Sequence, residues 1–72
     1  MDGTMVVNGV RAAYTMTPTG DGAGIVASIR YGQTGSWEAV GPPGTFFTTA
    51  VEARAAIRSQ IEANRTRVLG IV

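Results

Sequence analysis

The fold is decided by an alternating stretch, Val10-Arg11-Ala12-Ala13-Tyr14-Thr15-Met16-Thr17. Every second residue belongs to an apolar set, made of Val10, Ala12, Tyr14 and Met16. A period of two is the pattern of a β-strand with one buried face. The chain is therefore expected to build a sheet that has one apolar face, and another segment must cover that face.

Two turn-forming residues, Asn8-Gly9, precede this stretch and are flanked by valines. Both residues tolerate positive φ, so the pair predicts a tight hairpin between two strands. The alternative is a bulge, at which one long strand bends.

Turn-rich segments divide the next part of the chain. Residues 18–24 are dense in Pro, Gly and Asp and predict a loop. A second strand is expected from Ile25 to Tyr31 and, after a turn, a third from Ser36 to Val40, with Trp37 and Ala39 pointing inward. The run Gly41-Pro42-Pro43-Gly44 ends that third strand, because proline cannot donate to a ladder.

Matching the apolar faces predicts a register for these strands. We expect Tyr31 to lie opposite Trp37, and Ala12 opposite Ile29. The outer face then carries a row of charged residues, in the order Arg11, Arg30 and Glu38.

A helix is expected after the strands, from Ala50 to about Asn64. Thr49 and Glu52 have the spacing of a capping box, in which each residue bonds to the backbone of the other. A narrow apolar stripe along the helix faces the sheet, formed by Ala50, Ala53, Ile57 and Ile61. Val68 to Val72 is an apolar tail that predicts a short extra strand or a packed extension.

The sequence therefore predicts an α+β fold, an antiparallel meander of about three strands with one C-terminal helix packed on one face. Residues 1–72 are expected to form a single small domain. Its predicted core is Tyr14, Ile25, Ile29, Tyr31, Trp37, Phe46, Ile57 and Ile61.

The composition argues against catalysis. The chain has neither histidine nor cysteine, and all 6 of its basic residues are arginine. The commonest general base, the commonest metal ligand and the thiol nucleophile are thus missing. The 5 acidic residues are scattered along the chain, so a carboxylate metal site is not expected. We predict no enzyme activity, no metal and no cofactor.

The net charge of +1 is too small to indicate a nucleic-acid or membrane partner by itself. No signal-peptide pattern and no long apolar run appear, so a cytoplasmic location is expected. The loop Gly20-Asp21-Gly22-Ala23-Gly24 resembles a phosphate-binding loop in its glycine spacing. It joins two predicted strands and contains an acid, which favours a plain hairpin loop.

Three arginines of the predicted helix fall along one edge, beside the apolar stripe: Arg54, Arg58 and Arg65. One interpretation is a solvated edge. The other is a strip that grips an acidic protein surface or a phosphate backbone. Likewise, Trp37 and Tyr31 could stack a nucleic-acid base on an open sheet, but their expected place on the covered face favours core packing.

The segment from Gly44 to Ala55, Gly-Thr-Phe-Phe-Thr-Thr-Ala-Val-Glu-Ala-Arg-Ala, resembles the segment that leads into the helix in ethylene-response-factor and integrase-arm DNA-binding domains. The resemblance covers about a fifth of the chain. It implies a three-stranded sheet with a packing helix, and DNA contacts from the outer face of that sheet. Arg11 and Arg30 are the cations expected on this face.

The leading functional hypothesis is a small, non-catalytic protein-binding module, an accessory protein or inhibitor of the phage or mobile-element type, similar in style to anti-CRISPR proteins. It would bind through Arg54, Arg58 and Arg65 with the outer sheet face, or by β-augmentation at an edge strand. One alternative is a DNA-binding module that uses Arg11 and Arg30. The other is a structural homodimer joined through the tail at Val68 to Val72.

Overall fold

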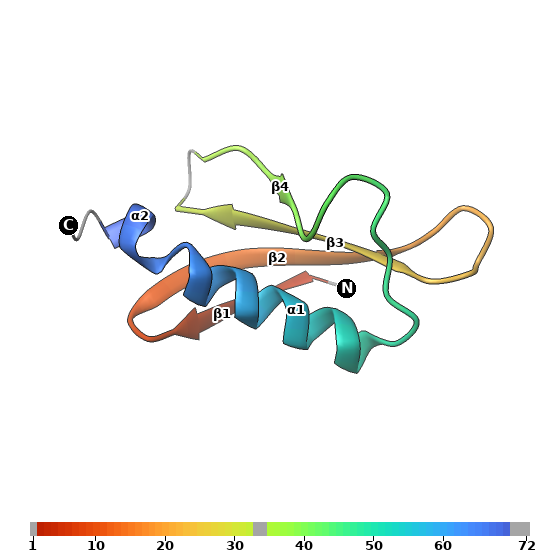
Figure 1. Ribbon diagram of the computed structural model, residues 1–72, viewed down its shortest axis with the longest axis horizontal. Coiled ribbons are helices and arrows are strands. Elements are labelled where there is room, and N and C mark those ends of the chain that lie inside the picture. Colours follow the sequence, from red (N-terminus) through yellow and green to blue (C-terminus); the bar gives the residue numbers. More distant parts are fainter. Residues whose placement is uncertain (1, 33–34, 70–72) are drawn as a thin grey trace.

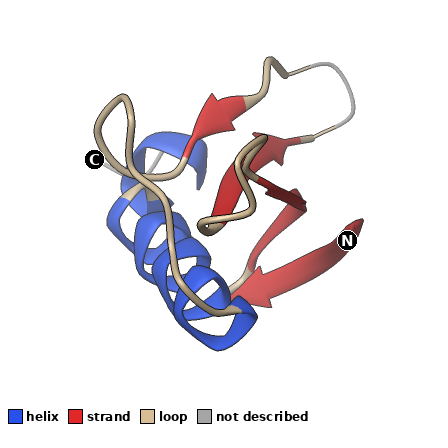
Figure 2. Cartoon of the chain, turned by 90° about the vertical axis from the view of Figure 1, so that its right-hand side faces the viewer, coloured by secondary structure: helices blue, strands red, loops and turns tan. Residues whose placement is uncertain are grey.

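The computed structural model describes residues 2–32 and 35–69. Four strands form one antiparallel sheet in sequence order (Figure 1): β1 (Asp2–Val7), β2 (Val10–Pro18), β3 (Ile25–Tyr31) and β4 (Glu38–Ala39). Helix α1 (Ala50–Ala63) packs on one face of the sheet (Figure 2), and α2 (Arg65–Leu69) follows it. The predicted α+β class, a meander with a helix on one face, is confirmed.

The hairpin interpretation of Asn8-Gly9 is confirmed. Both residues have positive φ, 50° at Asn8 and 87° at Gly9, as a two-residue type I′ turn requires. Val7 lies opposite Val10 across this turn, and the pairing continues to Asp2 opposite Thr15. The hairpin adds a strand to the three that were expected.

Helix α1 begins as predicted, with Thr49 as its N-cap. The Thr49 hydroxyl accepts a hydrogen bond from the backbone N–H of Glu52 at 3.2 Å. The Glu52 carboxylate accepts from the hydroxyl and the backbone N–H of Thr48, at 2.7 and 3.3 Å. Glu52 therefore bonds to Thr48, the residue before the N-cap, and not to Thr49 as in the expected capping box.

The tail from Val68 to Val72 was expected to form a short strand or a packed extension, and at Val68 and Leu69 the strand is wrong. Val68 and Leu69 belong to α2, and the Val68 N–H donates to the Asn64 carbonyl at 3.0 Å. Val68 is half-buried against the core, so this apolar residue is accommodated by helix packing and needs no strand. Residues 70–72 lie outside the described residues.

The core lies between α1 and the sheet. The predictions for Tyr14, Ile29, Ile57 and Ile61 are confirmed, and Ile25 and Tyr31 are partly buried against these residues. Trp37 and Phe46 were wrongly assigned to the core, since they are 46% and 51% exposed. The predicted core list omitted seven further buried residues: Val7, Val10, Ala12, Met16, Ala27, Val40 and Ala53. The strand alternation and the helix stripe had nevertheless placed Val10, Ala12, Met16 and Ala53 on the covered faces.

The strand registers explain the error at Trp37. Ala12 lies opposite Tyr31 and not Ile29, a shift of two residues that keeps each side chain on its expected face. In the next pair Glu38 lies opposite Ile29. That shift of one residue reverses the faces of β4, so Trp37 and Ala39 point outward.

The row expected from Arg11, Arg30 and Glu38 consequently does not form. β4 contributes only two residues, Glu38 and Ala39, to the pairing with β3 in the described structure, and so short a strand offers little alternation to match. Tertiary contacts decide its faces instead. Glu38 forms an ion pair with Arg67 of α2, and Val40 fills the core at 4% exposure.

Candidate functional site

A groove runs between the edge strand β1 and helix α1. It has a volume of about 320 Å³ and is lined by Met5, Val51, Arg54, Ala55 and Arg58. We call it the β1–α1 groove. Met5 is half-buried at the sheet end of the core, whereas Val51 is 80% exposed. The groove thus combines apolar side chains with two arginines, and no acid is among its lining residues.

The backbone of β1 forms one wall of this groove. β1 is the first strand in the sheet order, and no other strand among the described residues pairs with its free edge. Val7 and Val10 flank a two-residue turn, so they form a hydrogen-bonded pair, and such pairs alternate along the hairpin. The N–H and C=O groups of Thr4 and Val6 therefore point away from β2 and toward solvent.

The three arginines that the sequence placed on one edge serve two roles. Arg54 and Arg58 line the groove. Arg65 lies farther along, and its Nε donates to the Asn8 carbonyl at 2.9 Å. The Asn8 side chain also donates to Glu62 at 3.3 Å. Arg65 therefore links the start of α2 to the β1–β2 turn, and it does not line the groove with Arg54 and Arg58.

The sequence prediction missed the apolar members of the groove. Val51, Ala55 and Arg58 follow the helical spacing i, i+4, i+7, which places them on one helix face beside the core stripe. That second stripe was a usable signal. Met5 could not be assigned, because its role depends on which edge of the sheet the helix follows.

The outer face of the sheet is open. Figure 2 shows both helices against the other face, and no described helix covers this one. Arg11, on β2, and Arg30, on β3, both belong to this face, as expected. The unexpected member is Trp37, whose ring lies 5.0 Å from the Arg30 guanidinium carbon, a cation–π contact.

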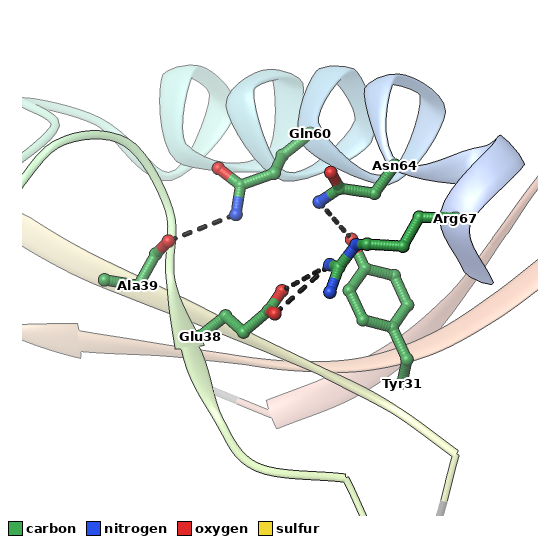
Figure 3. Close-up of polar contacts among 6 residues, drawn as sticks. All are labelled: Tyr31, Glu38, Ala39, Gln60, Asn64 and Arg67. Atoms are coloured by element: carbon green, nitrogen blue, oxygen red, sulfur yellow. Dashed lines mark hydrogen bonds and ion pairs between the residues drawn. The ribbon is translucent and has the colours of Figure 1, made fainter.

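Polar contacts on the helix side hold β4 in place (Figure 3). Arg67 donates to both carboxylate oxygens of Glu38, at 3.1 and 3.2 Å, and lies 5.7 Å from the Tyr31 ring. Asn64 donates to the Tyr31 hydroxyl, and Gln60 donates to the Ala39 carbonyl, both at 3.1 Å. These bonds tie the helices to the β3–β4 region and are structural.

Within residues 2–32 and 35–69, no three Asp, Glu, His or Cys side chains gather where they could hold a metal ion. Asp21, in the loop between β2 and β3, accepts hydrogen bonds from the Thr19 hydroxyl and the Ala23 N–H. These bonds lower the pKa of Asp21 below its ordinary value of 3.8. The absence of catalysis and of cofactors stays a prediction.

No helix in the described part of the chain is long and apolar enough to cross a membrane. No protein-family model matches the chain, and neither the curated proteins nor the solved structures contain a significant match. The resemblance of residues 44–55 to DNA-binding domains therefore stays a prediction, and functional arguments rest on the residues of this chain.

Proposed function

We propose that this chain is a non-catalytic protein-binding module that holds an extended, acidic segment of its partner as an additional strand along β1. The observation that carries this proposal is the combination of a free strand edge with a groove that contains two arginines and no acid. Strand addition takes affinity from backbone hydrogen bonds and specificity from pockets for alternate side chains.

The backbone of β1 sets where the partner strand lies. Its N–H and C=O groups pair with the outward groups of Thr4 and Val6. Successive side chains of the added strand point to opposite faces of the sheet. Those on the helix side enter the β1–α1 groove, where an apolar side chain contacts Met5 and Val51 and an acidic one reaches Arg58. A segment that alternates acidic or apolar residues with neutral ones fits this arrangement.

Charge favours a partner of a different kind over a second copy of the chain. Two copies joined edge to edge along β1 would bring Arg54 and Arg58 of one copy beside the same residues of the other. Like charges at such an interface oppose association. An acidic segment instead meets a groove whose charged side chains are both positive.

This way of binding suits a small accessory protein or inhibitor of the phage or mobile-element type, which acts by occupying an edge or site on a larger complex. The anti-CRISPR kind of inhibitor is one form that we include in the proposal. We place the interaction in the cytoplasm, a compartment that suits a chain without cysteine.

The test uses a synthetic peptide, Thr-Glu-Thr-Val-Thr-Glu, and a matched peptide with lysine in place of glutamate. NMR titration of the labelled protein follows the amides of β1 and of α1. We expect the acidic peptide to shift both groups of amides, and the lysine peptide to shift neither. Shifts confined to the outer face or equal shifts with both peptides would contradict the proposed groove.

Two substitutions separate the backbone contribution from the charge. Thr4→Pro removes an outward N–H but no bond to β2, so the fold is expected to survive while peptide binding is lost. Thr4→Val keeps the N–H and serves as its control. Arg58→Glu should weaken the acidic peptide a few-fold and allow the lysine peptide to bind. Unchanged binding by Thr4→Pro would refute strand addition.

A further inference from the structure

One end of the open outer face carries two arginines and the single tryptophan of the chain. Arg30 lies opposite Ala13, and Arg11 precedes Ala13 by two residues on the same face of β2. Arg11 and Arg30 are therefore diagonal neighbours, whose Cα atoms are about 7–8 Å apart in a sheet of this kind. Trp37 adjoins Arg30 through the 5.0 Å contact. We call these three residues the Arg–Trp cluster.

The ring of Trp37 is available as a stacking surface. The Trp37 residue is 46% exposed, a large exposed fraction for a side chain of this size. The Arg30 guanidinium lies against the ring, and its Nε is buried without a hydrogen-bond partner. The terminal nitrogens of that guanidinium remain the donors with which Arg30 can contact a ligand.

The charge around this cluster is positive because the register has removed its expected acid. Glu38 points toward the helices and pairs with Arg67, on the opposite side of the sheet from Arg11 and Arg30. The other acid of the strands, Asp2, lies on the edge strand β1 opposite Thr15, and β2 separates it from Arg30 on β3. Small side chains occupy the surface between, at Thr4, Ala13, Ser28 and Ala39. This flat surface gives room for a planar group to lie on the indole.

We infer that the Arg–Trp cluster binds single-stranded nucleic acid. A base stacks on Trp37, and the guanidinium groups of Arg11 and Arg30 contact the neighbouring phosphates. Stacking on aromatic side chains together with cationic phosphate contacts is how proteins bind single strands without regard to sequence. A duplex keeps its bases stacked on one another, and two arginines offer few of the phosphate contacts on which duplex affinity depends. A second copy of the chain, bound through the same face, would bring its own Arg11 and Arg30 close to those of the first copy, and these like charges would repel.

This inference is independent of the proposed peptide groove, because the residues that line the groove are not those of the Arg–Trp cluster and the two lie on opposite faces of the sheet. A failure of peptide binding therefore leaves it standing, and the reverse also holds.

The intrinsic fluorescence of Trp37 provides the test, since it is the only tryptophan. The full chain is titrated with a short oligothymidylate in low salt, with excitation at a wavelength that tyrosine does not absorb. We expect quenching that saturates. A chain of abasic sugar phosphates of equal length should quench much less, because it has no base to stack.

Salt and substitutions then identify the contacts. With two phosphate contacts, the logarithm of the binding constant should fall with the logarithm of salt concentration at a slope of about −1.4. Arg11→Gln and Arg30→Gln should each weaken binding, whereas the charge-matched control Arg58→Gln, on the helix side of the sheet, should not. With a labelled oligonucleotide, Trp37→Ala should reduce affinity about 5- to 100-fold and Trp37→Phe should retain much of it.

Several results would overturn the inference. The first two are an absence of quenching at low salt and equal quenching by the abasic chain. The third is tighter binding of a blunt-ended duplex than of the single strand. The last is quenching that appears when the protein concentration is raised without any oligonucleotide. The last result would assign the outer face to self-association. Equal weakening by Arg58→Gln would show that binding depends on net charge alone.

Discussion

The orientation of β4 can be tested by placing the same charged side chain at two adjacent positions. Val40 is 4% exposed in the core, whereas Ala39 is exposed on the outer face. Ala39→Lys should therefore change the free energy of unfolding by no more than about 0.5 kcal/mol. Val40→Lys places an ammonium group among apolar side chains, at a cost of several kcal/mol.

The expected difference is large compared with the stability of so small a domain. At about 0.05–0.15 kcal/mol per residue, 72 residues are stable by roughly 4–11 kcal/mol. Val40→Lys should leave much of the protein unfolded at room temperature. The milder Val40→Ala removes two methyl groups, which costs about 1.6 kcal/mol from transfer alone, and any cavity adds to this cost.

Urea denaturation followed by circular dichroism measures these differences, because the midpoint shifts while the slope stays constant if only stability changes. The register expected from the sequence, with Ala39 inward, predicts the opposite order of the two lysine variants. A larger loss for Ala39→Lys than for Val40→Lys would therefore refute the orientation of β4, and with it the exposure of Trp37.

Three further measurements test the packing, the helix cap and the loop. Ile57 is fully buried at the centre of α1, so Ile57→Ala should lower the free energy of unfolding by about 2–5 kcal/mol in urea titrations; a loss below that of Ile57→Val would contradict its place in the core. Thr49→Ala removes the acceptor of the Glu52 N–H and should cost about 1 kcal/mol, with Thr49→Ser restoring the loss. The hydrogen bond from the Thr19 hydroxyl lowers the pKa of Asp21 in the folded state. The stability that the charged Asp21 carboxylate contributes is therefore present above pH 3.8 and is lost as the pH falls through the folded pKa. Thermal melts at decreasing pH should show this loss, and Asp21→Asn should remove that component.

Much of the fold follows from local sequence. Asn8-Gly9 predicts a hairpin because both residues adopt positive φ at little cost. The alternation around Tyr14 predicts a strand with one buried face, and Thr49 predicts the start of α1 because its hydroxyl satisfies a free N–H of the first turn. These features need no knowledge of distant contacts, and the structure confirms them.

The candidate sites depended far more on tertiary structure. The sequence placed Arg54, Arg58 and Arg65 on one helix edge, but contacts with the Asn8 carbonyl separate Arg65 from the other two. Arg11 and Arg30 were correctly expected on the outer face, but Glu38, which was expected in the same row, lies on the helix side of the sheet.

The sequence by itself determined the strands, the hairpin and the capped helix, because their signals lie within a few residues of one another. Only the tertiary structure decided which face β4 turns outward and which sheet edge borders α1. A two-residue strand carries too little alternation to set its own register, so the ion pair of Glu38 with Arg67 and the burial of Val40 set it. Both candidate surfaces, the β1–α1 groove and the Arg–Trp cluster, are consequences of those long-range contacts.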